Sequence, residues 1–205
     1  MTNKIVGATP AGANYAITRN QVDGHDGGTV LRPKASGEQI SAGFTASTSG
    51  GSAFASGAVF GSHIPITEPT SIDAMGIRVA TSQASTNAKI LLYSCDADNH
   101  PVTLVATGTV ATTATGYVFG TTGTVNLTEG VYWATLRSDT GTTVRFQCLT
   151  NTYMSLVGTW SSTSTPMFVP TADVGTYASP NSTLSTWTYT TASTNSIPHV
   201  VLRLA

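Results

Sequence analysis

Charged side chains are scarce in this chain of 205 residues. Lysine, arginine, aspartate and glutamate together make up only 9% of the residues, whereas soluble domains usually contain about 25%. Serine, threonine, alanine and glycine take their place. A surface so poor in charge is weakly protected against self-association, so we expect partner subunits to cover much of it.

The shortage of charge also argues against nucleic acid as a partner. The net charge is −1, and the nine cationic side chains are scattered between Lys4 and Arg203, whereas phosphate backbones are bound by clustered lysine and arginine. Membrane insertion is not expected, because no apolar run approaches the roughly 18 residues that a spanning helix needs. The N-terminus is too polar for a secretory signal, which favours synthesis in a cytosol.

Cysteine is almost absent as well. Cys95 and Cys148 are too few for a disulfide framework, and each lies in an apolar run typical of a strand. We therefore expect two buried free thiols. The four histidines are far apart and, with two isolated cysteines, show no metal-binding spacing. The sequence thus predicts neither a metal nor another cofactor.

Catalytic motifs are missing too. Neither Gly-x-Ser-x-Gly nor His-Glu-x-x-His occurs. A glycosidase needs two facing carboxylates, but Asp73, Glu129 and Asp139 each fall at an expected strand end or turn. The stretch 96–99 could offer oxygen ligands to Ca²⁺ but lacks the glycine and distal glutamate of an EF-hand loop, and turn-forming Asp and Asn explain it more simply. We expect no enzymatic activity.

What the chain does contain is a series of short apolar runs separated by turn signals, beginning near residue 53. The expected strands are 58–60, 64–67, 75–79, 89–95, 102–110, 117–127, 130–137, 142–149 and 198–204. No window of twelve residues shows a helical stripe. Strands of this length and spacing predict an all-β protein, an antiparallel β-sandwich of the jelly-roll kind.

Three of these runs indicate where their strands lie. Pro65 lacks the N–H that a central strand needs, so its strand should be at an edge or a bulge. Alternation over 75–79 predicts a half-buried strand. The run 89–95 is almost entirely apolar, as expected of a central strand covered on both faces.

The run 130–137 is predicted to have two different faces. Tyr132, Ala134 and Leu136 should share one, and Trp133 should lie on the other. Tyr93 and Trp133 are large enough to span much of a sandwich about 10 Å thick, so we expect both in its core.

Two regions depart from the strand pattern. Residues 1–52 hold only short apolar islands among glycine, alanine and polar residues, which predicts an extended N-terminal arm or attachment segment. The sandwich is then expected over 53–205. Within it, 150–196 is too long for a hairpin loop and too aromatic for a disordered linker.

The aromatic side chains of the region 150–196 allow two interpretations. They could pack beneath loops or complete the sheets, or they could form a surface for a sugar or a partner subunit. The candidate ligand or subunit contacts are Trp160, Phe168, Tyr177, Trp187 and Tyr189.

Four parts of the chain, at 77–81, at 88–93 with the turn 98–101, at 127–134 and at 197–203, carry a resemblance. Together they resemble a β-sandwich module of tailed-bacteriophage structural proteins. Residues 77–81 are similar to its opening strand, and 88–93 with the turn 98–101 to a strand that ends in tyrosine before a turn ending in proline. Residues 127–134 match its Leu-x-x-Gly-x-Tyr-Trp strand, and 197–203 resemble its closing strand.

This resemblance implies a jelly-roll module of the head-decoration, head-fibre or tail-fibre type, commonly a homotrimer, located in the virion after synthesis in the host cytoplasm. Its partners would be other virion proteins, namely capsid or tail subunits. The leading hypothesis is a surface-exposed capsid decoration or fibre protein anchored by the N-terminal arm. The alternatives are a tail adsorption or receptor-binding protein and a free carbohydrate-binding module that binds a host-surface glycan.

Overall fold

The computed structural model describes residues 36–41, 51–54, 58–139, 143–149, 168–191 and 197–205. The chain divides into two compact units, Met1–Ala35 and Ser36–Ala205, and all described residues belong to the second. That unit is all-β, as the sequence predicts, and no described residue is helical.

The strands follow one another with mostly short connections. They are β1 (Gln39–Ser41), β2 (Ala58–Phe60), β3 (Ser62–Ile66), β4 (Thr70–Thr81), β5 (Asn87–Cys95), β6 (Pro101–Ala111), β7 (Gly116–Leu127), β8 (Gly130–Ser138), β9 (Arg145–Phe146), β10 (Cys148–Leu149), β11 (Phe168–Asp173), β12 (Trp187–Thr191), β13 (Ile197–Pro198) and β14 (Val200–Leu204).

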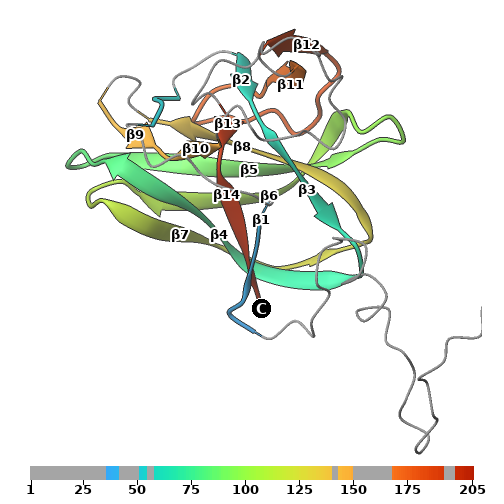
Figure 1. The fold of residues 1–205 in the computed structure, drawn as a ribbon, viewed down its shortest axis with the longest axis horizontal. Helices are drawn as coiled ribbons and strands as arrows, with labels where there is room; N and C mark the ends of the chain where they lie inside the picture. Colours follow the sequence, from blue (N-terminus) through green and yellow to red (C-terminus); the bar gives the residue numbers. More distant parts are fainter. Residues whose placement is uncertain (1–35, 42–50, 55–57, 140–142, 150–167, 192–196) are drawn as a thin grey trace, which may run out of the picture. The chain divides into compact units, whose positions relative to one another are not determined.

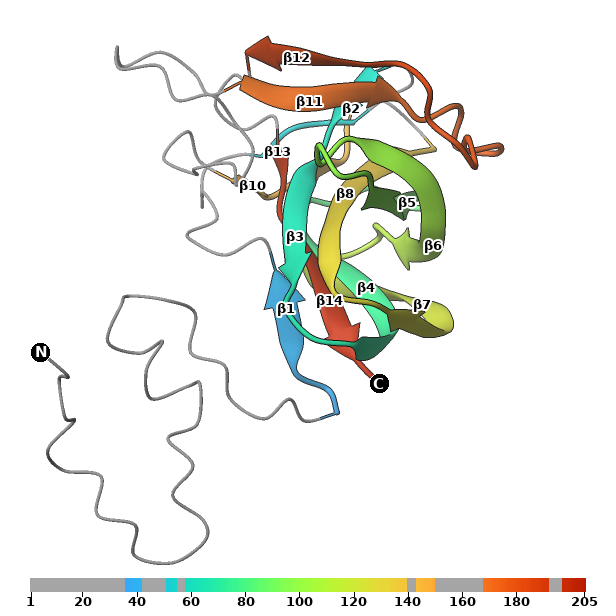
Figure 2. The same cartoon turned by 90° about the vertical axis from the view of Figure 1, so that its right-hand side faces the viewer.

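These strands form three layers, and every strand pair is antiparallel (Figure 1). The outer sheet has the order β1-β14-β4-β7, with β9 beside β4, and the inner sheet has the order β3-β8-β5-β6. The covering sheet, β12-β11-β2, lies over the face of the inner sheet that points away from the outer sheet (Figure 2). Strands β10 and β13 pair separately.

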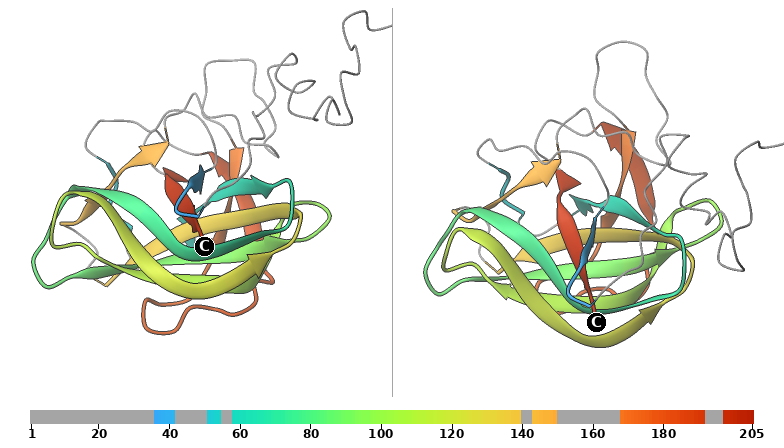
Figure 3. Two further views of the ribbon diagram at one scale, coloured as in Figure 1. Left: turned by 90° about the horizontal axis from the view of Figure 1, so that it is seen from below. Right: turned by 60° about the horizontal axis from the view of Figure 1, so that its bottom comes forward.

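The primary core lies between the outer and inner sheets. Figure 3 shows the ribbons of these two sheets from two further directions. Strand β4 contributes Met75, Ile77 and Val79, which alternate as predicted and are at most 1% exposed. Strand β5 contributes Ile90 and Leu92. Strand β8 contributes the three residues predicted to share a face, namely Tyr132, Ala134 and Leu136.

A second cluster lies between the inner sheet and the covering sheet. Leu91 and Tyr93 of β5 and Trp133 of β8 form its base and are fully buried. The cluster is completed by Val59, Ala172, Val174 and Leu184. Strand β5 is therefore covered on both faces, as its apolar run predicts.

The expected location of Tyr93 and Trp133 is wrong. Both are buried, but they point away from the interior of the sandwich and into the second cluster. A period-two pattern assigns residues to two faces without saying which layer each face meets. The covering sheet lies over the inner sheet, so the face of the inner sheet that points away from the outer sheet is apolar as well.

The strand edges are protected in different ways. Pro65 lies in β3, an edge strand of the inner sheet, as its missing N–H predicts. At the opposite edge, the backbone of 182–184 pairs with β6, through Leu104 N to the Ser182 carbonyl (2.9 Å) and Leu184 N to the Val102 carbonyl (2.7 Å). This edge is thus closed by part of the aromatic region.

The compact unit begins earlier than the expected boundary at 52/53. Strand β1 pairs with β14 through Ile40 and Leu202, so residues assigned to the N-terminal arm belong to the outer sheet. The expected strand 142–149 is divided at Gln147 into β9 and β10, which pair with β4 and β13 respectively. Within 150–196, the described residues build the covering sheet, while 150–167 and 192–196 lie outside the described residues.

Candidate functional site

The five predicted contact residues do not form one group. Trp160 lies outside the described residues. Phe168 and Tyr189 occupy paired positions in β11 and β12, opposite Thr191 and Pro170 respectively. Only Tyr177 and Trp187 have described side chains, and each contacts a residue of the β5–β6 hairpin.

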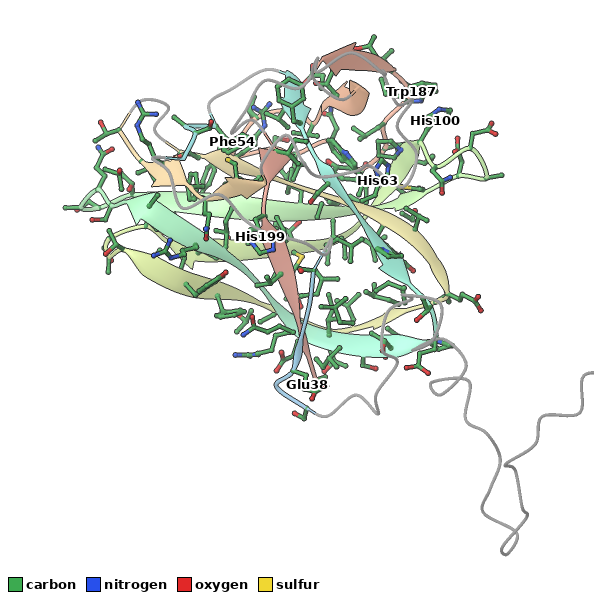
Figure 4. The ribbon with its side chains drawn as sticks, in the orientation of Figure 1. Glu38, Phe54, His63, His100, Trp187 and His199 are labelled. Atoms are coloured by element: carbon green, nitrogen blue, oxygen red, sulfur yellow. The ribbon has the colours of Figure 1, made fainter. Side chains whose placement is uncertain are left out.

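Trp187 stacks on His100 at the corner where the covering sheet meets the end of the β5–β6 hairpin (Figure 4). The ring centroids are 3.3 Å apart and the planes are inclined by 15°. The half-buried indole also packs against the second cluster. One face of Trp187 is therefore occupied by the protein itself.

Tyr177 is half-buried in the segment that follows β11. The Nζ atom of Lys89 lies 4.8 Å from the centroid of its ring, a favourable cation–π distance. Nearby, the hydroxyl of Tyr93 donates to the carbonyl of Asn181 at 2.8 Å. These contacts attach the segment 174–186 to the inner sheet.

The turn between β5 and β6 is organised by Asp96. Its Oδ1 accepts the backbone N–H groups of His100 (2.8 Å) and Asp98 (3.0 Å), which hold the pKa of the carboxyl below its usual value. Asn99 donates from its backbone to the Asp96 carbonyl and has a φ of 63°, which asparagine tolerates better than most residues. The turn explanation for the stretch 96–99 is thus confirmed.

A buried histidine from β3 contacts the same turn. Nε2 of His63 lies 3.1 Å from the carbonyl oxygen of Asn99, and because a carbonyl only accepts, this nitrogen carries a proton. His63 is 2% exposed. Burial lowers its pKa to about 4, and repulsion from His100 contributes in the same direction.

We call His63, Asp96, Asn99, His100 and Trp187 the histidine junction. In the junction, Nδ1 of His100 also lies 3.5 Å from Oδ2 of Asp96. The junction brings together an edge strand of the inner sheet, the β5–β6 turn and β12 of the covering sheet. No local motif announces it, because its residues come from three distant parts of the sequence.

The chemistry available at the junction is proton binding and aromatic stacking. The nearest thiol, that of Cys95, is only partly buried rather than fully buried as expected, and burial raises its pKa to about 12. A thiol that keeps its proton is a poor nucleophile. Both cysteines are free, as predicted.

Arg137 and His199 are buried polar residues that lie outside the junction. Arg137 is 2% exposed, and its guanidinium lies 3.9 Å from the carboxylate of Asp173. It also lies beside Tyr93. Burial raises the pKa of the Tyr93 hydroxyl to about 12. His199 lies between β13 and β14, and burial lowers its pKa. Its ring nitrogens find no hydrogen-bond partner among the described residues.

The segment that carries the most specific resemblance has a clear structural role. Leu127 is buried in the primary core, and Gly130 has a φ of +152°, which side chains rarely adopt. The Tyr132 hydroxyl accepts the backbone N–H of Thr128 at 3.1 Å and lies 3.2 Å from its carbonyl. Trp133 then enters the second cluster. The motif closes the β7–β8 turn and contributes side chains to both the primary core and the second cluster.

No protein-family model matches this chain, and no match was found among curated proteins or solved structures. Within the described ranges, no three histidine, cysteine, aspartate or glutamate side chains are grouped so that they could hold a metal ion. The described part of the chain also has no helix with the length and apolar character needed to cross a membrane.

Proposed function

We propose that this protein is a structural component of a bacteriophage particle, displayed on its surface as a capsid decoration or fibre protein. The observation that carries the proposal is the division of the chain into Met1–Ala35 and a compact β-sandwich unit. A short N-terminal unit that is followed in the chain by a larger β-sandwich unit suits attachment through the first and display of the second. The proposal of a phage protein, rather than another kind of structural protein, rests on the four parts of the sandwich that resemble the phage module.

The distribution of charge supports attachment through the N-terminal segment. Residues 1–35 hold four lysines and arginines against two acidic residues, whereas 36–205 hold five against eight. A net basic N-terminal segment favours partners with an acidic surface. The proposed partners are capsid or tail subunits, with a homotrimer as the proposed oligomer.

The use of the aromatic region supports a structural role over glycan binding. Trp187 stacks on His100, Tyr177 lies beside Lys89, and the strands that carry Phe168 and Tyr189 pair within the covering sheet. The rings of Trp187 and Tyr177 thus each contact the inner-sheet hairpin of the protein itself, whereas a carbohydrate platform presents open ring faces.

A binding experiment with particles tests the proposal. The full-length protein is mixed with particles of the phage whose genome encodes it, after that protein has been removed, and binding is measured by co-sedimentation. The double variant Arg32→Glu/Lys34→Glu should lose binding. The control Arg78→Glu/Arg145→Glu makes the same charge change in the sandwich and should bind normally.

Two results would contradict the proposal. One is absence of the protein from purified particles by mass spectrometry, and the other is loss of binding in the control but not in the N-terminal variant. Saturable binding to a glycan array that Trp187→Ala abolishes would instead favour a receptor-binding protein or carbohydrate-binding module.

A further inference from the structure

The histidine junction joins two layers at one corner of the molecule. Its contacts run from His63 in β3 to the carbonyl of Asn99, through the neighbouring ring of His100, and on to Trp187 in β12. Figure 4 shows His63, His100 and Trp187 on this one side. If His63 loses its contact with Asn99, the neighbouring His100 and its stacking contact with the covering sheet are therefore affected too.

Among the described side chains, few other apolar contacts hold the covering sheet. The described members of the second cluster beneath it are seven buried residues, whereas those of the primary core are 23. Layers held by fewer buried contacts open at lower free energy than the main core. The covering sheet is thus the part of the described unit most easily released.

We propose that the histidine junction is an acid-sensitive latch, which holds the covering sheet on the inner sheet and releases it when His63 takes up a proton. In the closed form, His63 is buried and its Nε2–H donates to Asn99. A second proton would place a full charge in this buried site. Opening of the turn exposes the ring to water and removes that cost.

The direction of the pH effect follows from proton uptake on opening. The pKa of His63 is about 4 when the latch is closed, and it returns to the ordinary value of about 6.5 when the ring meets water. The latch is fully stable above pH 6.5 and weakens as the pH falls towards 4. One proton bound on opening raises the opening constant by roughly twenty-fold between pH 7 and pH 5.

The surrounding charges modify this behaviour without reversing it. His100 repels a proton on His63, and Oδ2 of Asp96 lies 3.5 Å from Nδ1 of His100. Across the strand pair, β8 presents the uncharged Trp133 opposite His63. Farther along the same face, Arg137 and Asp173 offset each other at 3.9 Å.

Hydrogen exchange read by mass spectrometry tests the latch on the full chain. After correction for the intrinsic rate, protection of β11, β12 and the turn 96–101 should fall about twenty-fold from pH 7 to pH 5. Peptides of β4 and β7 should change much less. Equal loss in all strands, or no loss in β11 and β12, would overturn the proposal.

Substitutions identify the responsible histidine. His63→Gln keeps an N–H donor for Asn99 but cannot titrate, so exchange in β11 and β12 should become nearly independent of pH. His199→Gln is the matched control, because it removes another buried histidine away from the junction, and it should keep the acid response. If exchange in β11 and β12 of His63→Gln still depended on pH as in the wild type, the latch would be refuted. If that variant does not fold, the pH dependence of exchange in the wild-type protein decides whether the latch exists.

Discussion

The two faces of β5 show how differently the two halves of the protein are held together. Leu92 points into the primary core and Leu91 into the second cluster, and both are fully buried. The primary core is lined by strands from both sandwich sheets and is almost wholly apolar. The second cluster borders polar groups, including the Tyr93 hydroxyl, Arg137 and His63.

The two sandwich sheets determine the fold, and the covering sheet is an addition to them. The sandwich strands pair through long registers, such as β4 with β7 and β5 with β8. The covering sheet adds a three-stranded patch built from β2 and the late segment 168–191. We therefore expect changes in the primary core to affect the whole unit and changes in the second cluster to act first on the covering sheet.

The largest effect is expected for Trp133→Ala, which empties the centre of the second cluster. Trp133 is fully buried, and its ring centroid lies 5.9 Å from that of Tyr93. Removal of a buried tryptophan costs about 3–5 kcal/mol of unfolding free energy. Urea unfolding followed by far-UV circular dichroism measures the loss, and a nearly unchanged midpoint would contradict the burial of this side chain.

The adjacent leucines of β5 give the most direct comparison of the two layers. Each Leu→Ala change should cost about 2–5 kcal/mol, because both remove the same buried atoms. Leu92→Ala should reduce exchange protection throughout the unit. Leu91→Ala should lie at the low end of the range and act mainly on β11 and β12. If both variants gave the same exchange pattern, the two layers would be one cooperative unit.

The sequence predicted the sandwich better than the covering sheet, for physical reasons. The alternation at Met75, Ile77 and Val79 and the apolar run of β5 reflect local burial, which a single sequence displays. Strands β1, β11 and β12 were not predicted. They are short or rich in threonine and proline, and their pairing with β14, β2 and each other depends on residues far away in the chain.

The candidate site was predicted only in part. Aromatic composition pointed to Tyr177 and Trp187, but it could not identify Lys89 and His100 as their partners, which lie almost ninety residues away. His63 gave no signal at all. In the sequence it is an isolated histidine, and only the fold brings it to the carbonyl of Asn99.

The smallest expected changes in unfolding free energy are those of Gly→Ala substitutions at two glycines that each face an aromatic ring. A Cβ atom on Gly61 would lie 2.0 Å from Cε2 of Trp133, and one on Gly76 would lie 2.5 Å from Cε1 of Phe119. Trp133 is enclosed beneath the covering sheet and cannot move aside, so Gly61→Ala should cost about 1–3 kcal/mol.

Phe119, in contrast, is only half-buried on the face of the outer sheet that points away from the primary core, where Arg203 lies 5.7 Å from its ring. Its ring can turn away from a methyl group. An alanine also restricts the unfolded chain, which stabilises the native state by about 0.4–1 kcal/mol at a compatible site. Gly76→Ala should therefore be close to neutral in urea unfolding. A cost as large as that of Gly61→Ala would mean that the outer sheet is covered as tightly as the inner one, and the contrast between the two faces would fail.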